Sequence, residues 1–338
     1  MERIYLDFET RSKSDLTKVG AFKYFEDPST EVLCLSYAWN DLPVKTWTPD
    51  MLMYQPLWRK ISQQNLRLFC WGTFDILAWE KLMHQRYNWP RLPEGIWYDV
   101  MAASVSLGFP AKLEQAAPAL GLTEGKLMSG TSLINFFSKQ HKGGFREPHD
   151  HPEKFRHMIE YCERDAELVR SAHNEVGNLS ARERGVWLHT QQINRRGVSI
   201  DSGACRNIIN LIEKKKGLLN DAIAVHTGGV ITAVTQRERI RKWLHGECGF
   251  LLDDMQGTTL NKAIATIDEE LADPIAPEHH HKLREAKILM KWYINGNKSS
   301  VAKYKKMIDH LCEDRTIKGF LFYHGAGTGR YSGRGVQF

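Results

Sequence analysis

Near its start the chain reads Ile4-Tyr5-Leu6-Asp7-Phe8-Glu9, in which apolar and polar side chains alternate as they do in a half-buried β-strand. Asp7 and Glu9 are two residues apart, so both carboxylates project from the same face of this strand, about 7 Å apart. Their neighbours Leu6 and Phe8 point the other way, into the expected core. Two such carboxylates repel each other unless a cation lies between them, and hard oxygen ligands favour Mg²⁺ or Mn²⁺. An exposed strand edge without a metal is the alternative interpretation.

The residues that follow predict an α/β domain. The first 50 residues read as strands, and strands are expected at Val32 to Trp39, Val44 to Thr48 and Leu66 to Trp71. Helices are expected from Phe74 to about His84, from Pro93 through about Ser138 with turns between, and from about Glu153 to Val176. Strands, then a strand–helix unit, then helices that cover the sheet are typical of a layered α/β domain, here ending near Gly177.

Two later positions carry further acidic groups. Asp75 follows an apolar strand and precedes a helix, which places it at the carboxyl end of the strand, where open α/β sheets bind ligands. A plain role for Asp75 in the first turn of its helix, after Thr73 as a cap, is equally compatible with the pattern. Tyr161 and Asp165 are four residues apart in a helical segment, so the phenol and the carboxylate share one helix face.

Composition excludes several classes of protein. The 338 residues exceed one ordinary hydrophobic core, which predicts at least two domains. The chain has 42% hydrophobic and 25% charged residues, no apolar run long enough for a membrane span and no export signal, so a soluble cytoplasmic protein without membrane partners is expected. Six scattered cysteines without a C-x-x-C pair indicate free thiols in a reducing compartment.

The charge is unevenly distributed. The net charge is +6, yet residues 281–338 alone carry 12 Lys and Arg against 4 Asp and Glu. A basic C-terminal region after a slightly acidic one indicates that one part holds a polyanion on which the other acts, although a solvated lysine-rich helix face would give the same count. From Leu179 on, the chain is predicted to be mostly helical, with a short extended piece at Gly197 to Ile200 and a strand at Gly319 to Tyr323.

The four acids in this order, with Tyr161 four residues before the last, resemble the DEDDy class of 3′–5′ exonucleases. The matching motifs are Leu6-Asp7-Phe8-Glu9-Thr10, Phe74-Asp75 and Tyr161-Cys162-Glu163-Arg164-Asp165. The resemblance implies a ribonuclease H-like fold, a mixed sheet with flanking helices. One position departs from the family, whose second motif often has Asn four residues before the acid, where this chain has Trp71.

The resemblance also implies a mechanism. Asp7, Glu9 and Asp165 would bind two Mg²⁺ or Mn²⁺ ions directly, Asp75 would hold the second ion through water, and Tyr161 would orient the attacking water. Two such ions stabilise both the attacking and the leaving oxygen of a phosphoryl displacement. The product would be a nucleoside 5′-monophosphate.

The second half resembles bacteriophage-type family A DNA polymerases, in three stretches: ERGVWLHTQQINRRGVSID, LREAKILMKWYINGNKSSVAKYKKMID and HGAGTGRYS. The implied organisation is an exonuclease domain at 1–178, a helical thumb-like domain at 179–315 and the start of a palm at 316–338. The implied DNA contacts are Lys298, Lys303, Lys305, Lys306, Thr328 and Arg330. The residues of a polymerase active site are not expected within this chain.

The predicted function is therefore proofreading in phage DNA replication, by a monomer that takes a single-stranded 3′ end in the exonuclease site and a primer–template duplex along the thumb. Two other functions stay open. One is an RNA-trimming exonuclease of the same class, of the ribonuclease D type, and the other is a DNA-binding module whose acids no longer bind metal.

Overall fold

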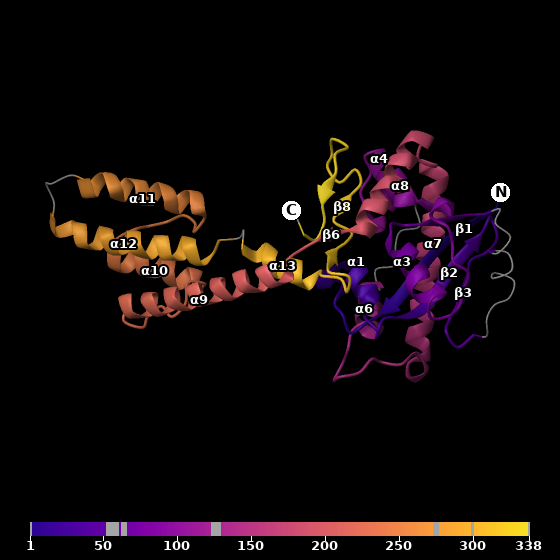
Figure 1. Cartoon of the computed structure of the whole chain (residues 1–338), viewed down its shortest axis with the longest axis horizontal. Helices are drawn as coiled ribbons and strands as arrows, with labels where there is room; N and C mark the ends of the chain where they lie inside the picture. The colour runs from indigo at the N-terminus through magenta and orange to yellow at the C-terminus, as the bar shows by residue number, and fades with distance from the viewer. Residues whose placement is uncertain are drawn as a thin grey trace. The chain divides into compact units, whose positions relative to one another are not determined.

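A computed structural model describes residues 2–51, 61, 66–122, 130–272, 277–298 and 301–336 (Figure 1). The basic stretch of the second half includes two residues, 299 and 300, that lie outside this description, as do the last two residues of the predicted palm segment. The chain forms two compact units: Met1–Ile200 together with Asp309–Phe338 (unit 1), and Asp201–Ile308 (unit 2). These units are defined by packing, and the three functional domains expected from the sequence remain a prediction.

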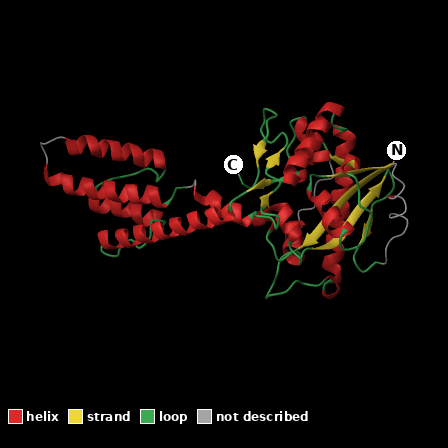
Figure 2. Ribbon diagram, viewed as in Figure 1, coloured by secondary structure: helices red, strands yellow, loops and turns green. Residues whose placement is uncertain are grey.

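Unit 1 is built on a five-stranded mixed sheet with helices on both sides (Figure 2). Its strands are β1 (Glu2–Arg11), β2 (Glu31–Trp39), β3 (Lys45–Trp47), β4 (Leu66–Cys70) and β5 (Trp97–Asp99). They lie in the order β3-β2-β1-β4-β5, with β1 antiparallel to β2 and parallel to β4. The predicted fold class, an α/β unit with a mixed sheet followed by a mainly helical region, is confirmed.

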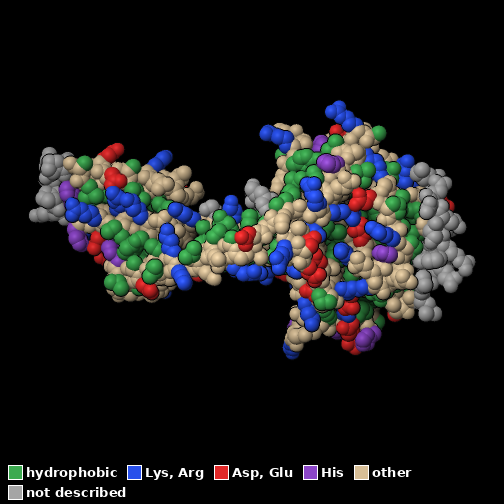
Figure 3. Space-filling model, in the orientation of Figure 1, with side chains coloured by type: hydrophobic (Ala, Val, Ile, Leu, Met, Phe, Trp, Pro, Cys, Tyr) green, Lys and Arg blue, Asp and Glu red, His purple; other side chains and the backbone are tan. Residues whose placement is uncertain are grey.

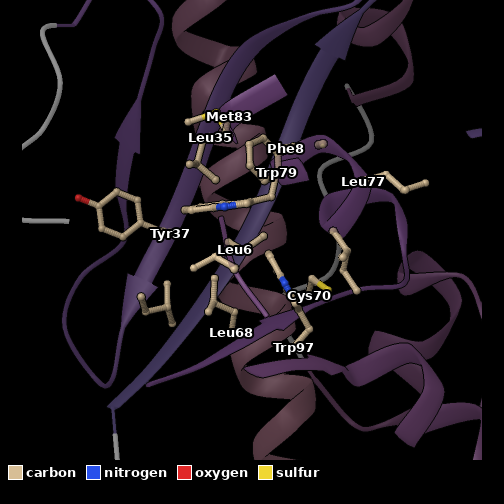
Figure 4. Close-up of a cluster of buried hydrophobic side chains, with 14 of the residues drawn as sticks. Leu6, Phe8, Leu35, Tyr37, Leu68, Cys70, Leu77, Trp79, Met83 and Trp97 are labelled. Atoms are coloured by element: carbon tan, nitrogen blue, oxygen red, sulfur yellow. The ribbon is translucent and has the colours of Figure 1, made fainter. Parts of the chain in front are cut away.

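The alternation in β1 divides its side chains between two cores. Leu6 and Phe8 lie in the larger cluster of buried apolar residues, together with Trp79 and Trp97, as Figure 4 shows. Tyr5 lies in a second cluster with Phe69 and residues of the long helix on the other side of the sheet. Asp7 and Glu9, which alternate with Leu6 and Phe8, therefore share the face of Tyr5.

Helices complete unit 1. They are α1 (Leu16–Glu26), α3 (Phe74–Ala78) continued by a π-helical segment (Trp79–His84), α4 (Val100–Ser106), α5 (Leu113–Ala119), α6 (Gly130–Phe137), α7 (Pro152–Val176) and α8 (Ala181–Arg196), with 3₁₀ turns at Glu94–Ile96 and Pro148–Asp150. The long helix expected from about Glu153 to Val176 is confirmed as α7, which packs against β1 and β2. The expected helix after Phe74 is also confirmed.

Two sequence-based expectations were wrong. The first 50 residues are not all strands, because α1 lies between β1 and β2, and its N-terminus is capped by the Asp15 side chain, which accepts a hydrogen bond from the Thr17 amide. The segment after Pro93 is not continuously helical, because it contains β5, which pairs in parallel with β4. A strand of three residues is too short to show the alternation that identifies strands in a sequence.

The segment after residue 309 belongs to unit 1 and packs on α8. It contains β7 (Thr316–Ile317), which pairs with β6 (Val198–Ser199), and the two-stranded pair β8 (Leu321–Phe322) and β9 (Ser332–Gly333). Asn194 of α8 binds the backbone of Leu321 twice: its Nδ2 donates to the carbonyl at 2.8 Å and its Oδ1 accepts from the amide at 2.9 Å. The expected extended piece after Gly197 and the strand around Leu321 are therefore both present.

Unit 2 is helical. Its helices are α9 (Ser202–His226), α10 (Arg237–Cys248), α11 (Gly257–Ala272), α12 (Pro277–Gly296) and α13 (Ala302–Asp309), the last of which ends one residue beyond the unit. An apolar core that includes Ile223, Leu244 and Leu289 holds α9 to α12 together. On the face shown in Figure 3, Lys and Arg side chains are spread over the surface of these helices, with acidic side chains among them.

Among the residues that the structure describes, no helix is both long and apolar enough to cross a membrane. All six cysteines are buried and none forms a disulfide, as the sequence predicts.

Candidate active site

Strand β1 presents Asp7 and Glu9 toward α7. Glu9 is paired with Cys34 of β2, and the register shifts immediately after it, because Thr10 pairs with Val32. Such an irregularity bends a strand and redirects the side chains beside it. Glu9 is 9% exposed, so burial restricts this carboxylate to the space between the sheet and its covering helices.

The turn after β4 brings Asp75 back to β1. Asp75 lies in the first turn of α3, is 4% exposed, and its Oδ1 accepts a hydrogen bond from the amide of Phe8 at 3.2 Å. Phe8 lies between Asp7 and Glu9, so this bond joins the second acidic motif to the first. Burial and then the negative charge of Asp7 raise the pKa of Asp75 well above its usual value. Thr73 lies at the N-cap position, but its side chain makes no capping hydrogen bond.

Helix α7 supplies Tyr161 and Asp165 from adjacent turns of one face. Both are buried, with exposed fractions of 1% and 4%. Burial, followed by the negative charges of Asp165 and Glu9, raises the pKa of the Tyr161 phenol, which also forms a hydrogen bond with Asp165. The phenol therefore stays protonated at neutral pH.

Three of the predicted acids line one cavity. Asp7, Asp75 and Asp165 lie around a space of about 290 Å³, together with Trp71 and Lys112 among others. Glu9 lines a neighbouring cavity of about 470 Å³, whose walls include Tyr24 and Lys139. Phe8 and Phe74 line both cavities. Asp7 and Asp165, 158 positions apart in the sequence, thus meet beside the second half of β1.

The donor set suits a hard divalent cation. Carboxylate oxygens are the ligands that Mg²⁺ and Mn²⁺ prefer, and the repulsion from Asp7 that raises the pKa of Asp75 is what a cation would relieve. Within the described ranges, however, no three His, Cys, Asp or Glu side chains are grouped closely enough to hold one metal ion. The acids are thus suitable ligands for such an ion, although their side chains are not arranged as a metal centre in this structure.

Sequence reasoning missed two residues that support this site. Gly130, at the start of α6, lies against the ring of Tyr161, where a Cβ atom would be 2.1 Å from Tyr161 Cε2. Asp99, at the end of β5, accepts a hydrogen bond from Gly72 in the turn before Asp75. A glycine at a helix start and a lone Asp before an apolar helix are common patterns, so only the tertiary contacts reveal these roles.

The predicted DNA contacts lie in both units. Lys298, Lys303, Lys305 and Lys306 lie on or just before α13, and their side chains are exposed. Thr328 and Arg330 lie in unit 1 in a tight turn, in which the Ala326 amide donates to the Arg330 carbonyl and Arg330 Nε donates to Thr328 Oγ1 at 3.1 Å. Their part in binding DNA remains a prediction.

Comparison with known proteins relates both units to polymerases. No protein-family model matches the chain. The chain is 30% identical, over 351 aligned residues, to a DNA polymerase of Bacillus phage SP02, and the match covers 100% of this chain and 51% of that protein. Its fold is similar to that of the POL domain of Pol1 from M. smegmatis, solved in complex with DNA primer-template and dNTP. The TM-score is 0.50 at 11% identity, and the match covers 98% of this chain and 51% of that one.

A mixed α/β unit with clustered acids and a helical second unit thus has the fold of a portion of a DNA polymerase. These similarities support a fragment of a phage-type family A DNA polymerase, and the chain spans about half the length of the curated relative that it matches.

Proposed function

We propose that unit 1 is a metal-dependent 3′–5′ exonuclease that removes the terminal nucleotide from a DNA strand. One observation carries this proposal: Asp7, Asp75 and Asp165, from three separate elements, line a single cavity. Carboxylates that face one another, two of them buried, cost stability unless they serve a ligand, so their convergence supports a functional site. The three groups belong to the three exonuclease motifs expected from the sequence.

Asp7, Glu9, Asp75 and Asp165 would hold two Mg²⁺ or Mn²⁺ ions. When bound, these ions would lower the pKa of the attacking water and neutralise the charge that develops on the phosphate. The carboxylates would hold that positive charge beside the second half of β1. Because Asp75 is held by the Phe8 amide, its position relative to Asp7 is fixed by the backbone.

Tyr161 would orient the attacking water. Its phenol keeps its proton at neutral pH, so it can donate one hydrogen bond while its oxygen accepts another. The water oxygen forms a bond to phosphorus as the bond from phosphorus to the 3′ oxygen of the preceding nucleotide breaks. The shortened strand keeps a 3′ hydroxyl, and a nucleoside 5′-monophosphate leaves.

The cavity beside Glu9 is the proposed place of the terminal nucleoside. Its volume of about 470 Å³ lies within the range of small-molecule sites. Phe74 supplies a partly exposed aromatic ring, on which any of the four bases can stack. A frayed end reaches such a site more easily than a paired one, because a mismatched base costs least to unpair.

The function of the wider chain is proposed from its relatives. The domains would be an exonuclease at 1–178, a thumb at 179–315 and the start of a palm at 316–338, within a monomeric polymerase of phage DNA replication that acts in the cytoplasm of its host. The exposed lysines of α13, with Thr328 and Arg330, would bind the phosphate backbone of a primer–template duplex without regard to sequence.

Release of the terminal nucleotide tests the proposal. Two oligonucleotides of matched sequence, one DNA and one RNA, carry a label on the 3′-terminal nucleotide and are incubated with the full chain and Mg²⁺, Mn²⁺ or EDTA. We expect labelled nucleoside 5′-monophosphate from DNA with either metal and none in EDTA. Faster release from RNA would instead favour the RNA-trimming function. Binding of duplex DNA without any release would leave a non-catalytic DNA-binding module.

A further inference from the structure

Asp99 is a buried carboxylate that the proposed chemistry does not use. It is 6% exposed, ends β5 and lies at the N-cap of α4. Its Oδ1 accepts hydrogen bonds from the amides of Gly72 at 2.9 Å and Ala102 at 3.1 Å, and its Oδ2 accepts one from Trp187 Nε1 at 3.2 Å. Three donors therefore converge on one side chain from three different elements.

The bond to Gly72 bears directly on Asp75. Gly72 lies in the turn between β4 and α3, three residues before Asp75, and it adopts a φ of +93°, which favours glycine. Gly72 packs against the side chain of Met101, which directly precedes Ala102 in α4. Asp99 thus fixes the backbone at Gly72. The first turn of the helix that follows carries Asp75, which lines the same cavity as Asp7.

The bond to Trp187 connects the same turn to α8. Trp187 is 2% exposed, and α8 also carries Asn194, which binds Leu321, and Glu183, whose carboxylate accepts a hydrogen bond from the Tyr323 hydroxyl at 2.6 Å. The position of the turn before Asp75 is therefore linked through Asp99 to the helix that anchors the segment after residue 319.

We propose that Asp99 is a positioning residue for the exonuclease site, which holds Asp75 in place through the Gly72 amide and ties the Asp75 turn to α8 through Trp187. The inference rests on the proposed exonuclease function of unit 1. A carboxylate suits this place because all three neighbouring groups are donors. An Asn side chain has one acceptor oxygen, so its amide nitrogen would face the Trp187 N–H, donor against donor.

Four variants of the full chain test the proposal. Asp99→Ala removes all three bonds, whereas Asp99→Asn keeps the two to Oδ1 and sets its nitrogen against Trp187. Asp99→Asn combined with Trp187→Phe relieves that conflict. Val105→Ala is the control, because it opens a cavity in the same helix α4 and removes none of the three hydrogen bonds of Asp99.

In exonuclease assays, Asp99→Ala is expected to lower kcat by roughly 10- to 100-fold, which is the usual effect of losing the partner that orients a functional carboxylate. The KM for single-stranded DNA should change by less than about twofold. Adding Trp187→Phe to Asp99→Asn is expected to raise kcat by about threefold or more, because the donor conflict is gone. Val105→Ala should lower Tm and leave kcat near that of the unchanged protein. Equal kcat in Asp99→Ala and Val105→Ala would overturn the proposal.

Amide hydrogen exchange of the metal-free protein gives a readout that does not depend on activity. Asp99→Ala should speed exchange across residues 72–78 by about tenfold, whereas Val105→Ala should leave that segment unchanged. Unchanged exchange in Asp99→Ala would contradict the anchoring role even if the exonuclease were active. Absence of exonuclease activity in the unchanged protein would instead refute the proposed function, and exchange would still decide whether Asp99 holds the turn.

Discussion

Gly130 is the residue on which the position of the Tyr161 ring most directly depends. The ring occupies the space in which any larger residue at position 130 would place its Cβ, with Tyr161 Cε2, Cζ and Cδ2 all within 2.8 Å of that point. Contacts this short do not persist, so a substitution must move either the ring or the start of α6. The position of the Tyr161 phenol, which would orient the attacking water, thus requires that residue 130 have no side chain.

Gly130→Ala is expected to displace Tyr161 and to lower exonuclease kcat by roughly tenfold or more, since misplaced catalytic groups lose much of their effect. Overpacking should also lower the free energy of unfolding by about 1–3 kcal/mol. Steady-state kinetics and urea unfolding measure the two effects. Gly185→Ala in α8, where a Cβ meets nothing within 4 Å, should leave kcat unchanged. Full activity of Gly130→Ala would contradict the role given to Tyr161.

The second residue-scale prediction concerns pH. Burial, partly offset by its hydrogen bonds, raises the pKa of Asp99 to about 6 from an ordinary value of 3.8. A raised pKa in the folded state stabilises the fold fully below pH 3.8, and this contribution is lost as pH rises through 6. The loss is about 3 kcal/mol at most, from 1.36 kcal/mol per pKa unit.

Asp99→Asn cannot ionise, so its unfolding free energy relative to the unchanged protein should rise between pH 4 and pH 7. Urea unfolding at four values of pH across this interval measures the difference. A difference between the two proteins that stays constant with pH would show that the pKa of Asp99 is not raised in the folded state.

At the scale of elements, the side chain of Asn194 joins α8 to β8. Asn194 both donates to and accepts from the Leu321 backbone, so its loss leaves a carbonyl and an amide without their partner. Asn194→Ala is expected to lower the local stability of residues 319–334 by about 1–3 kcal/mol. Hydrogen exchange of this segment measures the change, with Arg182→Ala, an exposed residue of the same helix, as control. Unchanged exchange in Asn194→Ala would show that other contacts hold the segment.

Elements with long periodic patterns were predictable, and short or locally encoded ones were not. The alternation of β1 and the amphipathic pattern of α7 each extend far enough to identify the element, and both are confirmed. Helix α1 was missed although Asp15 and Thr17 form a capping pair at its start, because strands on either side of it dominated the interpretation. Strand β5 has only three residues, and its pairing with β4 depends on tertiary contacts that a local sequence pattern does not show.

The candidate site residues could be proposed from the sequence, whereas the residues that hold them in position could not. The type and spacing of Asp7, Glu9, Tyr161 and Asp165 carry information that a sequence displays directly. The contacts of Gly130 with Tyr161 and of Asp99 with Gly72 join residues from different elements, and no local pattern encodes them. The catalytic roles of all these residues remain predictions.

At the scale of the whole molecule, the acidic site lies in unit 1 and the exposed lysines of α13 lie in the helical unit 2. If α13 binds the duplex backbone, Lys303→Ala with Lys305→Ala should weaken binding of duplex DNA equally for all sequences. The slope of log K against log salt concentration should fall by about 2, because about one counterion is released for each lysine. Fluorescence anisotropy across a salt series measures this slope. The Lys303→Arg, Lys305→Arg variant preserves both charges and should keep the original slope, whereas an unchanged slope in the alanine variant would exclude these lysines from the interface.

The chain spans about half the length of the phage DNA polymerase that it matches, and unit 1 is proposed to be a working exonuclease. The most direct measurement is digestion of a 5′-labelled single-stranded DNA with Mg²⁺, comparing Asp7→Ala/Glu9→Ala with Glu2→Ala/Asp41→Ala, which removes two exposed acids and makes the same change in charge. We expect a ladder that shortens from the 3′ end, kept in the control variant and lost in Asp7→Ala/Glu9→Ala. An intact substrate with the unchanged protein, or a ladder that persists without Asp7 and Glu9, would contradict it.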